Sequence, residues 1–169
     1  MACDLTAGRL RACKDSLGGN SAFYIYKDIV DSFTVTDGEA TAMNVLVLPF
    51  KFEIEGDLNT LEQEMVGTRD TGSRVNTQTL TIVLKKMDTP TNAQFNLLTA
   101  SFSQALVVDR NGNFLALGVD DGMDWTVSAA TGGAKGDGNI YTITGVATTS
   151  ELAPVLDGAT ETAFLAAVQ

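Results

Sequence analysis

Two stretches of this sequence alternate apolar and polar residues, and they constrain the fold more than any other feature. Residues 49–55 read Pro-Phe-Lys-Phe-Glu-Ile-Glu, and residues 78–86 read Gln-Thr-Leu-Thr-Ile-Val-Leu-Lys-Lys. A two-residue period is typical of a β-strand with one face in the core and the other in solvent. The core-facing positions predicted in this way are Phe50, Phe52, Ile54, Leu80, Ile82 and Leu84. We therefore expect the two stretches to pair as long antiparallel strands.

The connection between these strands, residues 56–76, is polar and rich in Gly, Thr and charged residues. It is too long for a tight turn, and it holds too few apolar residues to bury itself. Long connections of this kind inside a compact domain are usually functional or mobile. We expect this segment to form an arm that extends from the strand pair.

Shorter strands are predicted on both sides of this pair. In residues 21–27, Phe and Ile alternate with Tyr24 and Tyr26, and tyrosines suit a half-exposed face or an interface. The turn at residues 109–113 contains Asn-Gly between two apolar runs, which is a strong hairpin signal because both residues tolerate positive φ. Two further strands are expected at residues 123–129 and 140–146.

One helix interrupts the strand pattern. Asp88 precedes a Thr-Pro pair, as is common where a helix begins. Phe95, Leu98 and Phe102 then recur at steps of three and four residues, so a helix over residues 90–101 is expected to lie on the sheet. The predicted fold class is mainly β: an antiparallel β-sandwich or barrel with one flanking α-helix and a long β-hairpin arm.

The chain has 169 residues, which is enough for one domain with a proper hydrophobic core. The clear strand pattern ends near residue 148, so we expect a β-barrel domain at 1–148 and a C-terminal extension at 149–169. The extension is apolar and alanine-rich, with a short optional helix in which Phe164, Leu165 and Val168 would form a stripe. The apolar side chains of such a segment must be buried, either against its own domain or against a neighbouring molecule.

No apolar run approaches the length needed to cross a bilayer. The first five residues also lack the basic patch and apolar stretch of a secretory signal. We therefore expect a protein that is made in a cytoplasm and has no membrane partner.

The composition argues against several functions. The 21 acidic and 11 basic residues give a net charge of -10, which repels phosphates and disfavours a nucleic-acid binder. The absence of histidine removes Ser-His and Cys-His nucleophiles and nearly all zinc sites. Cys3 and Cys13 alone make a poor metal site. We expect no catalytic residue, no metal ion and no cofactor.

Some local motifs suggest other functions, although each fails in detail. The turn at 109–113 resembles a calcium loop, but its glycine is in the fourth position, and Asp120 stands where a bidentate Glu belongs. The Gly-rich loop at 131–138 lacks the lysine pattern of a phosphate-binding loop. A hydrolase could use Asp120, Asp121 and Asp124, but Asp-Asp-Gly is mostly a turn.

The main alternative function is a non-enzymatic binding module on a β-sandwich, which would be carbohydrate-dependent (with a carbohydrate as its ligand) or calcium-dependent. A carbohydrate site needs a solvent-exposed aromatic platform. Only Trp125, Tyr24 and Tyr26 are available to form one.

Several segments taken together resemble bacteriophage tail tube proteins, also called major tail proteins. These segments are Met-Ala-Cys-Asp-Leu-Thr-Ala-Gly-Arg at 1–9, followed by Cys-Lys-Asp at 13–15 and Gly-Gly at 18–19; Leu-Thr-Ile-Val-Leu-Lys-Lys-Met-Asp at 80–88; and Val-Asp-Arg-Asn-Gly-Asn at 108–113, leading to Gly-Val-Asp-Asp-Gly-Met-Asp at 118–124. Their order and spacing carry the similarity, which spans most of residues 1–148 and ends after Thr148.

This resemblance implies a structural subunit and not an enzyme. Six copies would form a ring, and rings would stack into a hollow tube that conducts the DNA genome during ejection. The expected partners are other copies of the chain, further tail proteins such as a tape measure, tail tip or terminator, and transiting DNA that is not specifically bound. The expected location is the tail of the virion, after synthesis in the host bacterial cytoplasm.

Site residues follow from this model of a tube. The lumen carboxylates are predicted to be Glu53, Glu55 and Asp57, because they lie on the clearest polar strand face. Salt bridges between subunits are predicted for charged residues of the arm, namely Glu62, Glu64, Arg69, Asp70 and Arg74.

Overall fold

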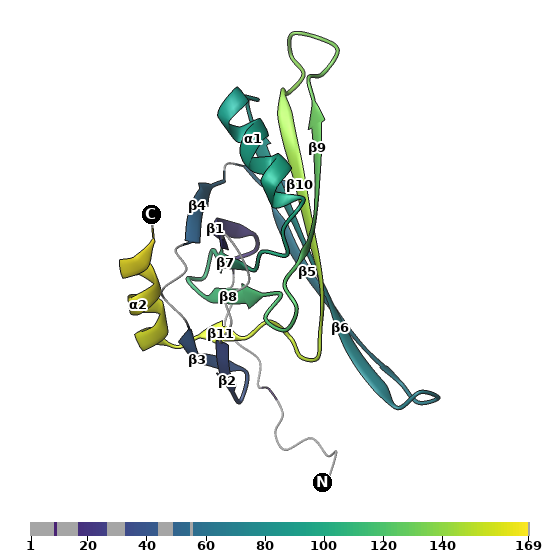
Figure 1. Ribbon diagram of the computed structural model, residues 1–169, viewed down its shortest axis with the longest axis vertical. Helices are drawn as coiled ribbons and strands as arrows, with labels where there is room; N and C mark the ends of the chain where they lie inside the picture. Colours follow the sequence, from purple (N-terminus) through teal and green to yellow (C-terminus); the bar gives the residue numbers. More distant parts are fainter. Residues whose placement is uncertain (1–8, 10–16, 27–32, 44–48, 55, 169) are drawn as a thin grey trace.

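The computed structural model describes residues 9, 17–26, 33–43, 49–54 and 56–168, which form two sheets and two helices (Figure 1). The larger sheet contains β1 (Asn20–Tyr26), β2 (Phe33–Thr36), β3 (Glu39–Met43), β4 (Pro49–Glu53), β7 (Ala105–Asp109), β8 (Phe114–Leu117) and β11 (Val155–Leu156). The smaller sheet contains β5 (Thr60–Thr68), β6 (Ser73–Lys85), β9 (Asp124–Ala130) and β10 (Ile140–Thr149). The helices are α1 (Thr89–Leu98) and α2 (Gly158–Ala167).

The two sheets form a mostly antiparallel β-sandwich, which confirms the predicted fold class. The strand order is β2-β3-β11-β8-β7-β1-β4 in the larger sheet and β5-β6-β10-β9 in the smaller one. The pair of β11 and β3 is parallel, whereas the other strand pairs are antiparallel. The β5–β6 hairpin extends well past the rest of the molecule at one end of the smaller sheet (Figure 1).

The main core lies between the two sheets and under α1. Leu80 and Ile82 are buried there, as their alternation predicts, and Phe95 and Leu98 of α1 close one end of the core. The Phe95 ring meets the Tyr141 ring edge-on, with 4.9 Å between centroids. Aromatic pairs in this geometry add to the stabilisation from buried apolar area. The helix is therefore a structural part of the sandwich.

Two details of the predicted helix are different in the structure. The helix spans residues 89–98 and not 90–101, with Asp88 as N-cap and Thr99 as C-cap. Phe102 lies beyond the helix and is 59% exposed, so the expected apolar stripe ends at Leu98. The predicted N-cap of this helix is confirmed, because the Asp88 carboxylate accepts a hydrogen bond from the Thr91 N–H at 2.8 Å.

A second core covers the other face of the larger sheet. Phe164 of α2 is fully buried and packs edge-on against Tyr24, with 4.9 Å between ring centroids. Tyr24 and Tyr26 are consequently buried, so the prediction of a half-exposed tyrosine face was wrong. Burial also raises the pKa of Tyr26. The strand β1 lies between two layers, which explains why four consecutive residues of it are buried.

The C-terminal residues pack onto the same sheet as the rest of the chain. Strand β11 pairs with β3 on one side and with β8 on the other. α2 then lies on the side of the larger sheet away from the smaller sheet (Figure 1). The inward-facing side chains of the described segment 149–168, such as Leu156 and Phe164, are thus covered by their own chain, whereas Leu165 is 48% exposed.

The strand pairing expected around the arm was wrong. Strand β4 pairs with β1 in the larger sheet, while β6 pairs with β5 and β10 in the smaller one. The segment expected to be an irregular arm supplies β5, which pairs with β6 through a four-residue turn. A partner this close in sequence costs little loop-closure entropy. Strand β4 remains at a sheet edge, where Phe50 is 46% exposed instead of buried.

The Asn-Gly hairpin between β7 and β8 is confirmed, and its turn is closed by one carboxylate. Asp109 accepts hydrogen bonds from the backbone N–H groups of Asn111 and Asn113, each at 2.8 Å, and from both of their side-chain amides. Gly112 has a φ of 87°, as this turn requires. The carboxylate that a calcium loop would use is therefore committed to the turn itself.

This turn predicts a pH dependence of stability. Desolvation opposes ionisation of Asp109, but the hydrogen bonds from Asn113 and Asn111 outweigh it and lower the pKa of the carboxyl. A carboxyl with a lower pKa in the folded state stabilises the protein above its unfolded pKa of about 3.9, and that contribution is lost as the pH falls through the folded pKa. We expect Asp109→Asn to lower the free energy of unfolding at pH 7 and to flatten its fall below pH 4, measured by urea denaturation.

The matched control for this variant is Asp121→Asn, which removes an exposed carboxylate of the next turn. It should leave the pH profile close to that of the parent. A profile for Asp109→Asn that is as steep as the parent's would contradict the role given to Asp109.

The two described helices, of ten residues each, are too short to span a membrane.

Candidate assembly surfaces

The smaller sheet has one face on the core and one face without cover from the described residues. Thr60, Thr81, Thr144 and Thr126 are neighbours in one row across all four strands. Directly opposed residues in neighbouring strands point to the same face. Thr81 follows the buried Leu80 directly in β6, and successive residues of a strand point to opposite faces, so the row faces outward. We name the outward-facing side chains of β5, β6, β9 and β10 the threonine face.

The threonine face is weakly acidic. The adjacent row contains Glu62, Thr79, Val146 and Asp124 in register, and Glu64 follows one step further along β5. By the same register, the only basic residue of this face is Lys85, at the far end of β6. The centre of the face thus presents hydroxyl groups and carboxylates, but no cation.

Both edges of the smaller sheet are open among the described strands. Strands β5 and β9 each pair on one side only. The four strands alternate in direction, so β5 and β9 run in opposite directions. Unpaired edges offer rows of N–H and C=O groups to another chain. Two copies of this sheet placed edge to edge would continue the antiparallel order.

The outer half of the β5–β6 hairpin is exposed on both faces. Val66 is 51% exposed and lies opposite Val75, which is 39% exposed. Arg69 and Asp70 lie in the turn at the tip, and neither has a hydrogen bond or ion pair with the described residues. An apolar pair with an adjacent pair of opposite charges, held away from the body, is typical of a segment that contacts another molecule.

The five charged residues predicted for the arm do lie on this hairpin, but on different sides of it. Glu62 and Glu64 belong to the threonine face, whereas Arg74 pairs in register with Gly67 on the opposite face. Arg74 contacts Glu151 of its own chain at 3.6 Å, with both side chains more than half exposed. Such a pair contributes little stability.

Polar side chains tie the base of the hairpin to the loop after β10. The Asn76 amide donates to the Thr149 hydroxyl at 3.1 Å and to the Glu151 carbonyl at 2.9 Å. The Gln63 side-chain carbonyl accepts from the Ala153 N–H at 2.8 Å. Sequence reasoning missed these residues, although they occupy inward positions where the alternation calls for apolar side chains. That mismatch was the available signal.

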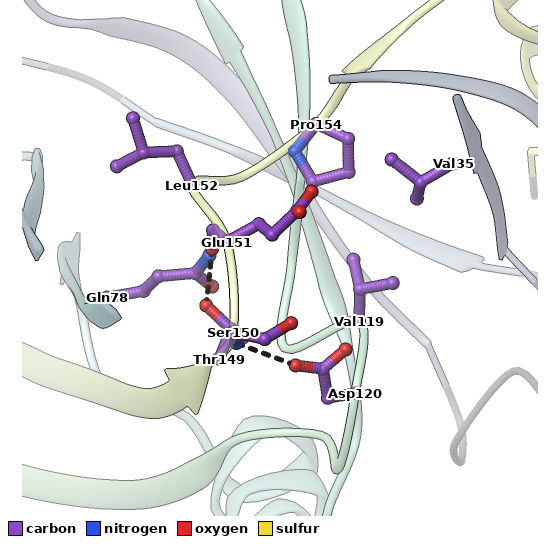
Figure 2. A pocket seen from close by; sticks show the side chains of 9 residues that line it. All are labelled: Val35, Gln78, Val119, Asp120, Thr149, Ser150, Glu151, Leu152 and Pro154. Atoms are coloured by element: carbon purple, nitrogen blue, oxygen red, sulfur yellow. Dashed lines mark hydrogen bonds between the residues drawn. The ribbon is translucent and has the colours of Figure 1, made fainter. Parts of the chain in front are cut away.

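A cavity of about 130 Å³ opens beside this base (Figure 2). It is lined partly by Gln78, Asp120 and Glu151. Gln78 is fully buried, and its side-chain oxygen accepts from the Gly118 N–H at 3.0 Å. The Asp120 carboxylate accepts from the Ser150 N–H at 2.9 Å, which closes the loop onto the turn before β9 (Figure 2).

The predicted lumen carboxylates are not on the threonine face. Glu53 is on the edge strand β4 of the other sheet and pairs with Lys51 at 3.3 Å. Asp57 follows it and pairs with Arg110 at 2.7 Å. Glu55 lies outside the described residues. Glu53 and Asp57 thus have cationic partners, whereas Glu62 and Glu64 have no ion pair within the described chain.

The three residues considered for the aromatic platform of a carbohydrate-binding module do not form one. Trp125 is 6% exposed, and its indole N–H donates to the Ser103 carbonyl at 2.9 Å. Tyr24 and Tyr26 are buried under α2, as described above. All three side chains are therefore part of the hydrophobic cores.

The carboxylates considered for hydrolysis or calcium binding do not form a metal site. Across the described ranges, no three His, Cys, Asp or Glu side chains gather closely enough to hold an ion. Cys3 and Cys13 fall outside those ranges. Comparison with models of protein families, with curated proteins and with solved structures finds no match for this chain.

Proposed function

We propose that this protein is the structural subunit of a bacteriophage tail tube, which acts by self-assembly and not by catalysis. One observation carries the proposal: the smaller sheet has a cation-poor open face bounded by two unpaired edges of opposite direction. Such a sheet can join its copies edge to edge and turn the same face toward a common axis. The sequence resemblance described above independently supports a tube subunit.

The dimensions of such a ring suit a DNA conduit. Six copies of the four-stranded sheet would supply 24 strands. With strands about 4.8 Å apart and tilted by about 40°, the closed ring of strands would have a diameter of roughly 48 Å, measured between backbones. Subtracting about 5 Å of side chain on each side leaves roughly 38 Å, which admits duplex DNA. Ring closure by a heterologous contact of this kind is a common symmetry solution.

The threonine face is the surface that we assign to the channel. DNA binding depends on neutralisation of phosphates by Lys and Arg, so a wall without cations at its centre holds DNA weakly. Carboxylates at Glu62, Glu64 and Asp124 would repel the phosphates further. DNA would then pass without specific contacts. The tape measure, the tail tip or the terminator would be further partners, and the virion tail would be the location.

Electron microscopy of the purified protein tests the proposal directly. We expect hollow tubes or six-fold rings at near-neutral pH, with subunit-to-subunit density continuous between β9 and β5. A protein that remains a monomer at high concentration, with or without a tail-tip complex as template, would contradict the proposal.

The assignment of the channel surface has its own test. We expect the triple variant Glu62→Lys, Glu64→Lys, Asp124→Lys to form tubes that co-sediment with DNA at low salt and release it at high salt. The matched control carries the same charge change at the carboxylates predicted from sequence, Glu53, Glu55 and Asp57. Retention of DNA by the control alone would move the channel to those residues.

A further inference from the structure

The cavity beside the base of the hairpin contains a buried donor that has no acceptor. Gln78 lines this cavity and is fully buried. Its bond with the Gly118 N–H, at 3.0 Å, requires an oxygen, so the amide nitrogen Nε2 is the other atom of the pair. Nε2 has no hydrogen-bond partner within the described chain, and the amide is turned toward Thr149 and Glu151 (Figure 2). A buried donor of this kind is suited to a ligand that brings an oxygen acceptor.

The mouth of this cavity combines an apolar rim with carboxylates. Val35 and Leu152 line it, and they are 38% and 52% exposed. Asp120 also lines it, and Asp121 is exposed directly after Asp120. Neither aspartate has an ion pair within the described residues. A suitable occupant therefore carries a cation on an aliphatic stem, next to an oxygen acceptor.

The turn at the tip of the β5–β6 hairpin has these properties. Arg69 is exposed and forms no ion pair with the described part of its own chain. An arginine stem packs on apolar surface while its guanidinium binds carboxylates. Residues 69–72 lie between the paired strands, so their carbonyl groups are not used in the ladder. Because the tip projects away from the body (Figure 1), the matching cavity must belong to a second copy.

The open edges of the smaller sheet bring the tip of one copy to the cavity of the next. Glu62 and Asp124 lie in one row across the sheet, and β5 continues past this row toward the tip. In a closed ring with the tilt used above, four strands stagger neighbouring copies by about 16 Å, or roughly five residues. A stagger in one sense keeps β5 paired with β9 of the neighbour and sets Arg69 beside the neighbour's Asp121. The opposite sense would carry β5 past the end of β9 and leave no ladder.

We infer that the hairpin tip of one copy docks at this cavity of the neighbouring copy in the same ring. Arg69 pairs with the neighbour's Asp121 and Asp120, and a carbonyl of the turn accepts a hydrogen bond from the neighbour's Gln78. The inference rests on the proposed function and specifies the contact that closes its ring. It also gives the salt bridge predicted for Arg69 a partner.

Exchange of charge between the two sides tests this contact. We expect Arg69→Asp to lower the pelletable fraction by about tenfold or more at low salt, because it sets like charges against each other. Asp121→Arg should have the same effect. The double variant Arg69→Asp, Asp121→Arg restores opposite charges and should recover most of the assembly. A misfolded variant could not be rescued by a second change in this way.

The matched control is Lys135→Asp, which makes the same change of charge in the exposed loop between β9 and β10. It should assemble as the parent does. All variants should keep the circular dichroism spectrum of the parent.

The outcomes separate the inference from the proposed function. Parent protein without rings or tubes overturns the proposed function. Parent tubes together with full assembly of Arg69→Asp overturn the inference alone, and so does a loss that the double variant does not reverse. In a high-resolution map of the parent tube, we expect the turn within hydrogen-bond distance of the neighbour's Gln78. Water as the sole occupant of the cavity, with the hairpin placed elsewhere, would also overturn the inference.

Discussion

Removal of the outer half of the β5–β6 hairpin is expected to leave a folded protein that no longer forms tubes. The variant lacks residues 66–75 and joins Met65 to Asn76 through Asn-Gly, a turn suited to two-residue hairpins. Met65 and Asn76 are already paired in register, so the remaining ladder is kept. The deleted residues are exposed, and among the described residues Arg74 is the one of them that forms an ion pair with the body of the protein, through Glu151. The free energy of unfolding should fall by about 1 kcal/mol or less.

The measurement is the pelletable fraction after ultracentrifugation, with urea denaturation to check the fold. The fraction should drop to background. A second variant, Val66→Thr with Val75→Thr, keeps the length of the hairpin and removes its exposed apolar pair; we expect a partial loss. Leu165→Thr, an equivalent change on the exposed side of α2, is the control and should assemble normally. Normal tubes from the shortened hairpin would refute its role in assembly.

Phe164→Ala is expected to be the most destabilising single change in the C-terminal segment. Phe164 is fully buried, and its ring contacts those of Tyr24, Tyr26 and Phe114 with centroids 4.9 to 6.4 Å apart. Truncation of such a side chain costs about 3–5 kcal/mol because it removes buried apolar area and leaves a cavity. Urea denaturation should show this loss as a lower midpoint.

The neighbouring Leu165 provides the matched control for this prediction. It is 48% exposed on the same helix. Leu165→Ala should cost less than about 1 kcal/mol, since surface substitutions have small effects. Equal and small effects of both variants would mean that α2 does not pack on the larger sheet.

The alternation of residues predicted which side chains are buried, but it did not identify the neighbouring strands. Leu80 and Ile82 face the core as expected. The same pattern fits any partner with a matching apolar face, so residues 49–55 were assigned to the wrong sheet. The deciding factor was β5, whose own alternation is weakened by Gln63 at an inward position. A polar side chain at an inward position breaks the alternation of apolar and polar residues, so the strand is not detected from the sequence pattern.

The burial of β1 on both faces was also readable in principle. Its residues Phe-Tyr-Ile-Tyr are all aromatic or β-branched, and a continuous apolar run is typical of a strand covered on both sides. The tyrosine hydroxyls instead favoured the interpretation that one face of this strand is partly exposed to solvent. The cover is α2, and nothing local to β1 could indicate a helix more than 130 residues away in sequence.

The candidate assembly surfaces were predicted only in part. A projecting polar arm was expected at residues 56–76, and the structure forms it as the β5–β6 hairpin; the salt bridges between subunits assigned to its charged residues stay a prediction. The threonine face and the open edges of its sheet arise from the register of four strands. Both depend on pairings between segments distant in sequence, and a local pattern carries no information about such pairings.

The loop between β9 and β10 and the projecting β5–β6 hairpin lie at opposite ends of the smaller sheet (Figure 1), and this polarity has a consequence for the growth of a filament. A filament built from such subunits by repeated translation has two chemically different mouths. One mouth offers the β9–β10 loops and the other offers the β5–β6 hairpins, so a capping protein that fits one mouth has no site on the other. Elongation and termination would then occur at separate ends, which gives the finished conduit an entrance and an exit.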